Sequence, residues 1–255
     1  MTPWELLAVL ALGVGAGAIN TVVGSGTLIT FPVLLATGLP PVTATVSNAL
    51  GVMPGSVSGA IAYREELKGQ ARRIRKLCVG ALLGGLTGAT LLLALPATAF
   101  EVIVPVLVGL ALVLVALQPM VARAVGRRRT PTRDGSRRDG GPALFTALTL
   151  ASVYGGYFAA AQGIIYLSLM GVLLDENLQR LNAIKNVLVA VVNAVAALFF
   201  LLVADFDWTA VALLSVGSAL GGQLGARLGR RFSPTVLRLL VVTVGSLALV
   251  QLLVR

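Results

Sequence analysis

Long stretches without a charged side chain dominate this sequence. Asp, Glu, Lys and Arg are absent from residues 6–63, 77–100, 102–122, 140–174, 186–204 and 208–226. A helix needs about 20 apolar residues to cross a bilayer. Only 12% of the 255 residues are charged, about half the share in a soluble domain. The sequence therefore predicts an all-α polytopic membrane protein set in a lipid bilayer, and it excludes a soluble enzyme, a disordered chain and a disulfide scaffold.

Two residue types that often carry chemistry are scarce. The chain has no histidine and one cysteine, Cys78, which excludes a Ser-His or Cys-His pair and a His-based metal site. Gly24-Ser25-Gly26 resembles part of an intramembrane serine-protease motif, but the usual histidine base is missing. We expect no enzyme, no cofactor and no metal ion. Residues 1–20 lack the basic start of a signal peptide and are expected to remain in the mature chain.

The positive charge is concentrated in three short segments. The net charge is +10, and 17 of the 20 basic residues lie within residues 64–76, 123–138 and 227–238. Short basic loops between apolar runs stay in the cytoplasm. Phe232 is the one aromatic residue within these three segments, which argues against a nucleic-acid partner. We expect residues 64–76, 121–142 and 227–234 inside, and the turns at 95–99 and 204–207 and both termini outside.

This assignment gives opposite directions to matching segments of the two halves. The predicted complete crossings are 43–63, 77–95, 99–120, 183–203, 208–227 and 234–254. The first of them runs from outside to inside, whereas its counterpart, 183–203, runs from inside to outside. We therefore expect a first membrane repeat (1–120), a basic cytoplasmic linker (121–142) and a second membrane repeat (143–255).

The two halves also resemble each other in sequence. Residues 79–89 align with 216–226 at an offset of 137, with four coincident glycines, and an offset of 138 pairs Asn48 with Asn186. A repeated and oppositely directed half is typical of secondary transporters with inverted repeats. The alternative is chance similarity between glycine-rich helices. The aligned glycines are expected to allow close helix packing. They are Gly84, Gly85, Gly88, Gly221, Gly222 and Gly225.

Each half opens with an interrupted apolar segment. Residues 6–37 are broken at 20–26, and residues 143–174 are broken at 155–163. Irregular backbone inside a membrane occurs only where protein or a water-filled cavity satisfies it. We expect a broken-helix hairpin followed by about three transmembrane helices in each half, with the two breaks near the transport site.

Polar residues deep in the apolar runs are the candidates for substrate binding. Asn182, Asn186 and Asn193 would spread over roughly 40° of one helix face, and Asn48 matches Asn186 in the first half. An amide both donates and accepts hydrogen bonds, so these side chains could bind an oxyanion. The alternative is that they join neighbouring helices.

The breaks supply the remaining candidates. Backbone N–H groups at the helix starts after Gly26 and Gly163 would present a positive dipole end to an anion, unless these glycines only turn the chain. Lys185 is expected to extend toward the membrane surface. The complete predicted substrate-binding set is Asn20, Gly24, Ser25, Gly26, Asn48, Gln162, Gly163, Asn186 and Asn193, with Asn182 and Thr27 as neighbours.

The sequence resembles the TauE/SafE family of sulfite-exporter-like permeases. The resemblance lies in residues 15–64, 154–172, 181–200 and 220–234, and so covers nearly the whole chain. It implies transport of small organic or inorganic anions, often sulfur-containing, across a bacterial inner (plasma) membrane. The second break reads Ala159-Ala160-Ala161-Gln162-Gly163, where the family pattern leads us to expect a glycine at Ala159 or Ala161.

The main functional hypothesis is a secondary transporter that moves a small anion, sulfite- or sulfonate-like, by alternating access at the repeat interface. The rival is a passive anion channel. A scaffold or receptor subunit would need a soluble domain that the sequence does not contain. Carboxylates are rare inside the apolar runs, so the sequence names no coupling ion; it also leaves the oligomeric state and the identity of the anion open.

Overall fold

The chain folds into a helical membrane protein. The structure is a computed structural model that describes residues 2–127, 140–228, 239, 241–247 and 249–250, and it contains no β-strand in those residues. The predicted all-α class is confirmed. The helices are α1 (Pro3–Val22), α2 (Thr27–Ala36), α3 (Pro41–Ala62), a short 3-10 helix η1 (Arg64–Leu67), α4 (Ala71–Ala94), α5 (Ala97–Arg127), α6 (Gly141–Tyr157), α7 (Gln162–Leu173), α8 (Leu178–Val203) and α9 (Trp208–Leu228).

Four described helices are long and apolar enough to cross a membrane: α1, α4, α8 and α9. Their outer faces carry apolar side chains such as Leu82 and Leu202, which are exposed and are suited to contact lipid. Helix α3 is equally long, but it is less apolar because it buries Thr45, Ser47 and Asn48. Its polar face turns into the protein and helps to form the site described below.

The helices form two bundles, and each bundle contains one helix from the other half of the chain. The first bundle consists of α1, α2, α3 and α9; the second consists of α4, α6, α7 and α8. Helices α3 and α8 pack against each other where the bundles meet. The long helix α5 contacts α7 and α3.

Helices α4 and α9 each pack in the bundle of the other half of the chain, and they do so through the aligned glycines. A Cβ at Gly84 would meet the Thr149 carbonyl of α6, and a Cβ at Gly221 would meet the Val14 carbonyl of α1. One turn later, Gly88 and Gly225 make the matching contacts with the carbonyls of Val153 and Ala18. The prediction that these glycines allow close helix packing is confirmed, and the pattern occurs in both halves.

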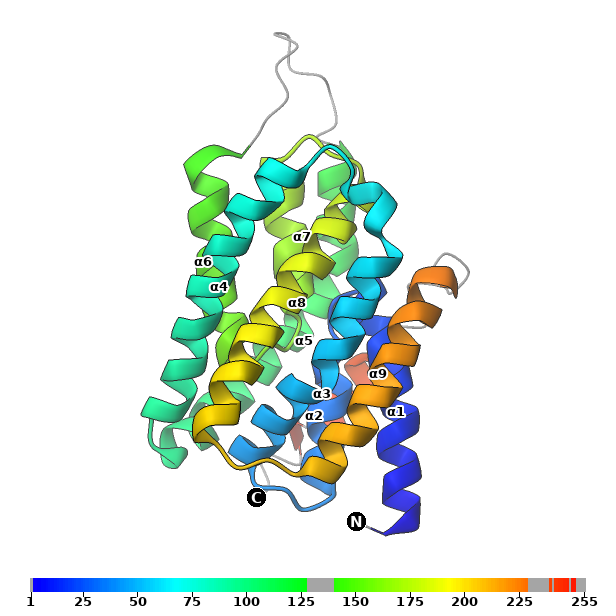
Figure 1. Cartoon of the computed structure of the whole chain (residues 1–255), viewed down its shortest axis with the longest axis vertical. Helices are drawn as coiled ribbons and strands as arrows, with labels where there is room; N and C mark the ends of the chain where they lie inside the picture. The colour runs from blue at the N-terminus through cyan, green and yellow to red at the C-terminus, as the bar shows by residue number, and fades with distance from the viewer. Residues whose placement is uncertain (1, 128–139, 229–238, 240, 248, 251–255) are drawn as a thin grey trace, which may run out of the picture.

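The two hairpins lie in opposite directions. Helix α1 begins and α2 ends at the lower end of the molecule in Figure 1, whereas α6 begins and α7 ends at the upper end. The broken-helix hairpins are therefore present in both halves. Their opposite directions support the inverted repeat, whose orientation across the membrane stays a prediction.

The boundaries of the predicted linker differ from those of the helices. Helix α5 continues to Arg127 and α6 begins at Gly141. Residues 128–139 of the linker and 229–238 of the third basic segment lie outside the described residues. In the last predicted crossing, residues 241–247 are helical, and Gly245 lies against Leu112 of α5.

Candidate transport site

The first break is produced by a glycine that ends α1. Gly24 has φ +88°, a left-handed conformation that is typical of the residue closing a helix. Its N–H donates to the Ile19 carbonyl at 3.1 Å. Helix α2 starts three residues later at Thr27, so the carbonyl end of α1 and the amide end of α2 both lie inside the protein.

The second break uses alanines for the same purpose. Ala159 has φ 62° and Ala161 has φ 56°. Residues other than glycine rarely adopt this left-handed backbone conformation. The resemblance to the family led us to expect a glycine at one of these two positions. The Tyr154 hydroxyl donates to the Ala160 carbonyl across this turn, and α7 begins at Gln162.

The two breaks contact each other where the bundles meet. The Gly163 N–H donates to the Gly24 carbonyl at 3.1 Å. A Cβ on either glycine would lie 2.5 Å from the Cα of the other, so no other residue fits at this crossing. Phe31 of α2 and Phe158 of the second break add an edge-to-face ring contact with centroids 5.1 Å apart. The interrupted helices thus meet at one point in the core.

Lys185 is buried beside this crossing. Its side chain is 0% exposed, and its Nζ donates to the carbonyls of Asn20 and Thr21, both at 2.9 Å. These carbonyls belong to the last turn of α1, where intrahelical partners are missing and the helix dipole is negative. The expectation that Lys185 extends to the membrane surface is wrong, because the residue lies about two turns inside α8 and faces the end of α1.

Two amides of α8 bind the same end of α1. Asn182 Nδ2 and Asn186 Nδ2 donate to the Thr21 carbonyl at 3.2 Å and 3.3 Å. The Thr21 carbonyl therefore accepts hydrogen bonds from three side chains of α8. The predicted common face of Asn182, Asn186 and Asn193 is confirmed, since all three are buried toward the first bundle.

A second polar contact joins the bundles at Ser56 of α3. Asn20 Nδ2 and Asn193 Nδ2 donate to Ser56 Oγ at 3.2 Å and 3.1 Å, and Ser56 donates to the Val52 carbonyl at 3.3 Å. Sequence reasoning missed Ser56. Its position eight residues after Asn48 places it on the same face of α3, which could have identified it.

Asn48 acts on the other piece of the first hairpin. The Thr30 hydroxyl donates to Asn48 Oδ1, and Asn48 Nδ2 donates to Thr27 Oγ1 at 3.4 Å. Asn48 therefore holds α2, while Asn186 holds the end of α1. The two matched amides both support the first break, one on each side of it, and their role in substrate binding stays a prediction.

Gln162 lies in a separate polar network of the second bundle. Its Nε2 donates to the Tyr166 hydroxyl at 2.8 Å, and that hydroxyl lies 2.6 Å from Ser152 Oγ. Gly155 leaves room for the Gln162 amide, since a Cβ there would overlap it. Tyr166 and Ser152 were not anticipated, because a single tyrosine or serine in an apolar run gives no periodic pattern.

Several buried polar atoms near the breaks have no partner. Within the described residues these are Thr21 Oγ1, Ser25 Oγ, Tyr157 Oη, Gln162 Oε1 and Asn182 Oδ1. Buried polar atoms in proteins are nearly always hydrogen-bonded, so unpaired ones call for an explanation such as a ligand or an ion. All five atoms belong to the two breaks or to α8 beside Lys185.

In the described part of the chain, backbone amides without a hydrogen bond lie at both breaks, and those of the second break belong to Ala160 and Ala161. The amides of Gly24 and Gly163 already donate to carbonyls, so these glycines contribute close packing. No hydrogen bond is formed by the amides of Ser25, Gly26 and Thr27 within the described residues. Donors for an anion are thus available at the start of α2. Gly26 also packs closely, since a Cβ there would lie 2.5 Å from the Ala16 carbonyl.

Interrupted helices that meet in the core of a membrane protein, beside polar groups and a buried lysine, define a transporter of the broken-helix class. The chain belongs to the sulfite exporter TauE/SafE family, whose sequence profile matches residues 9–252. The protein is thus a membrane transporter.

Relatives in several bacteria carry the same general description. The chain is 29% identical over 240 residues to "Probable membrane transporter protein YfcA" of Escherichia coli K12, covering 93% of this chain and 86% of the relative. It is 28% identical over 242 residues to a "Probable membrane transporter protein" of Haemophilus influenzae, covering 93% and 91%. A relative from Sinorhizobium, "Probable membrane transporter protein ORF9", is 24% identical over 93% of this chain and 88% of its own length. No solved structure matches the chain.

Proposed function

We propose that the protein is a secondary transporter for small anions, sulfur-containing or organic and sulfite- or sulfonate-like, that works by alternating access where the two bundles meet. The buried cation Lys185 carries this proposal. It lies beside the crossing of the two breaks and contacts only neutral groups through its ammonium. The family, described as sulfite exporters, supports the substrate class.

The charge of Lys185 favours an anionic ligand. A buried ammonium costs several kcal/mol unless an opposite charge compensates it. The ion pairs of the described residues all lie elsewhere, among Arg64, Lys68, Arg73 and Arg180 and their glutamates. Two carbonyls satisfy two of the three ammonium protons. A bound oxyanion supplies the missing charge and accepts the remaining proton.

The first break supplies further donors for such an oxyanion. The Ser25 hydroxyl is buried without a partner, and the amides of residues 25–27 are free. These groups and Lys185 belong to different bundles, so a ligand held between them senses the relative position of the bundles. That is the requirement for alternating access around a central site.

One contact favours a carrier over the passive channel. The backbones of Gly24 and Gly163 touch at the centre of the molecule, which closes a straight path between the bundles. An anion passes only if the bundles move. Counterflow in proteoliposomes separates the two mechanisms, because a substrate on the opposite side accelerates a carrier and leaves a channel unaffected.

The experiment uses purified protein in proteoliposomes with labelled sulfite, thiosulfate and sulfoacetate, and with chloride as a control. We expect uptake of at least one sulfur anion, accelerated by the same anion inside. Absence of uptake for the whole panel would contradict the substrate class. Uptake without acceleration would favour the channel.

We further propose that the protein lies in the plasma membrane of a bacterium, with η1 and the start of α6 in the cytoplasm. The bacterial relatives and the basic segments support this orientation. In a Cys78→Ser background, Thr98→Cys is expected to react with an impermeant thiol reagent from outside, and Ser136→Cys only after the membrane is opened. Equal reaction of both in intact cells would exclude the inverted repeat.

A further inference from the structure

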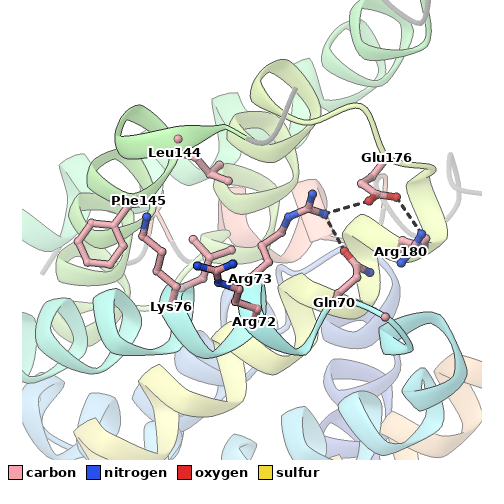
Figure 2. Close-up of a pocket in the computed structure, with 11 residues that line it drawn as sticks. Gln70, Arg72, Arg73, Lys76, Leu144, Phe145, Glu176 and Arg180 are labelled. Atoms are coloured by element: carbon pink, nitrogen blue, oxygen red, sulfur yellow. Dashed lines mark hydrogen bonds and ion pairs between the residues drawn. The ribbon is translucent and has the colours of Figure 1, made fainter. Parts of the chain in front are cut away.

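A cationic pocket lies at the end of the second bundle where α4, α6 and α8 begin, and its Arg180 precedes Lys185 by five residues along α8. It has a volume of about 590 Å³ and is lined by the first turns of α4, α6 and α8. Figure 2 shows Arg72, Arg73 and Lys76 extending from α4 toward this space, with Glu176 and Arg180 on its opposite side. The proposed transport function makes no use of these residues.

The charges of the pocket are strongly unbalanced. Arg73 Nη1 lies 2.9 Å from a Glu176 carboxylate oxygen, and Arg180 Nη1 lies 3.3 Å from the other. Gln70 Oε1 accepts a further bond from Arg73 at 2.9 Å. Glu176 is the carboxylate that lines the pocket, against four cations. Arg72 and Lys76 form no ion pair within the described part of the chain.

The backbone adds to this positive potential. Helices α4, α6 and α8 all begin at the pocket, and a helix start carries roughly half a positive charge on its free N–H groups. In α4, the first backbone N–H that donates to a backbone carbonyl is that of Ile74. The amides of the residues before it in the first turn have no backbone acceptor and face out of the helix end. Three positive helix ends and two uncompensated side chains therefore converge on one cavity.

The walls of the pocket make it more than a patch of surface charge. Leu77 and Leu144 are buried beneath it, and Phe145 is half-buried at its side. Apolar walls strengthen the interaction of a bound charge with the cations, because they reduce the screening by water. The two ion pairs of Glu176 hold Arg73 and Arg180 in place, so a ligand does not have to order them.

We propose that this pocket is a second anion site, separate from the transport site, that binds a phosphate group from the cytoplasmic side. A phosphate carries up to two negative charges and several acceptor oxygens, which match guanidinium and ammonium donors. The group comes either from a soluble phosphate compound or from the headgroup of an anionic phospholipid. The proposal does not depend on what the transport site carries.

The first test measures binding of inorganic pyrophosphate to the purified full-length protein in a neutral detergent by calorimetry. The double variant Arg72→Gln/Lys76→Gln is expected to weaken binding at least tenfold. The matched control is Arg75→Gln, since Arg75 is exposed on the same helix turn and does not line the pocket. Thermal unfolding of each variant verifies that it is folded.

The second test identifies the source of the phosphate group. Native mass spectrometry records the lipid that the protein retains after extraction from vesicles. The vesicles consist of phosphatidylcholine with roughly 20% phosphatidylglycerol, an anionic lipid of the kind that attracts basic segments. Lipid retention that the double variant loses and Arg75→Gln keeps identifies a headgroup site, and pyrophosphate binding with the same pattern identifies a soluble ligand.

The proposal is overturned by any of three results. The first is that wild-type protein binds neither probe. The second is that Arg75→Gln lowers binding as much as the double variant, which would reduce the pocket to part of a diffuse basic surface. The third concerns Lys185→Met, which is expected to bind both probes as wild type does; loss of binding there would show that the pocket is not a separate site.

Discussion

The first break is bonded by polar side chains of the other bundle, whereas the polar side chains at the second break bond within their own bundle. Lys185, Asn182 and Asn186 all bind the Thr21 carbonyl at the first break. At the second break, Phe158, Ala160 and Ala161 are buried in the apolar core. The two halves thus share a chain path, while the polar side chains that cross between the bundles meet at the first break.

The exchange of helices between the bundles explains how this asymmetry arises. The donors at the first break come from α8, a helix of the second half, across the contact between α3 and α8. The second break receives from the first half mainly close backbone contacts, such as that of Gly85 with Gly156. Symmetric backbone contacts can therefore coexist with an asymmetric set of polar contacts.

The largest expected effect comes from removing the cation. Lys185→Met is expected to lower uptake of the transported anion by at least a hundredfold, because the compensating charge is lost. The folded yield should stay the same or rise, since methionine does not carry the several kcal/mol that an uncompensated buried charge costs. Uptake per folded molecule, from proteoliposomes with quantified protein, is the measurement.

Lys68→Met is the matched control, because Lys68 is an exposed lysine whose ammonium pairs with Glu65 at the surface. Its uptake should equal that of wild type. If Lys185→Met transported normally but folded poorly, the lysine would be a structural link between α8 and α1, and the difference between the two breaks would have no functional meaning.

The next effect concerns the crossing itself. Gly24→Ala is expected to cost several kcal/mol in stability, since the alanine must adopt φ +88° and its Cβ would lie 2.5 Å from Gly163 Cα. Gly38→Ala separates the two causes. Gly38 has φ +86° but nothing within 4 Å of its Cβ, so its substitution should cost only about 1–2 kcal/mol.

The folded fraction, measured by size-exclusion chromatography in detergent, should fall much further for Gly24→Ala than for Gly38→Ala. Equal losses would mean that the left-handed backbone accounts for the whole effect and that the breaks do not press on each other.

A smaller effect is expected at the matched amides. Asn186→Ala should weaken transport about tenfold to a hundredfold, in line with the 1–3 kcal/mol lost when a buried hydrogen-bonding group is left unpaired. Asn48→Ala should act equally strongly if a ligand bridges the two sides of the first break, and less strongly if Asn48 only holds α2 through Thr27 and Thr30. The measurement is the concentration of anion that gives half-maximal uptake, with Asn177→Ala, at the start of α8, as a control.

The helices and the breaks could be predicted from the sequence because each depends on a local pattern. Uncharged runs of membrane length, Gly24 and the aligned Gly84 and Gly221 all constrain the chain nearby. The role of Lys185 could not be predicted in this way. A lysine near the start of an apolar helix commonly reaches the surface, and only the packing of α8 against the end of α1 shows where its ammonium lies.

The pairing of Asn48 with α2 and of Asn186 with α1 has the same origin. Their matched sequence positions suggested amides facing each other across a symmetry axis. Because the bundles exchange helices, each amide instead meets a different piece of the same hairpin. Contacts between distant segments depend on the tertiary arrangement, which a single sequence does not encode in any local pattern.

The smallest expected effect concerns the alanines that occupy left-handed positions in the second break. Ala159 has φ 62° and is only partly buried, so Ala159→Gly relieves a backbone penalty of about 1–2 kcal/mol at an entropic cost of roughly 0.5–1 kcal/mol. A net stabilisation of about 0.5–1 kcal/mol should raise the thermal midpoint in detergent by a few degrees. Ala160→Gly is the control, because Ala160 is fully buried and does not have a positive φ; it should lower the midpoint. If Ala159→Gly also lowered the thermal midpoint, glycine would not stabilise the second break. The two breaks would then differ in the backbone conformation they require as well as in their polar contacts.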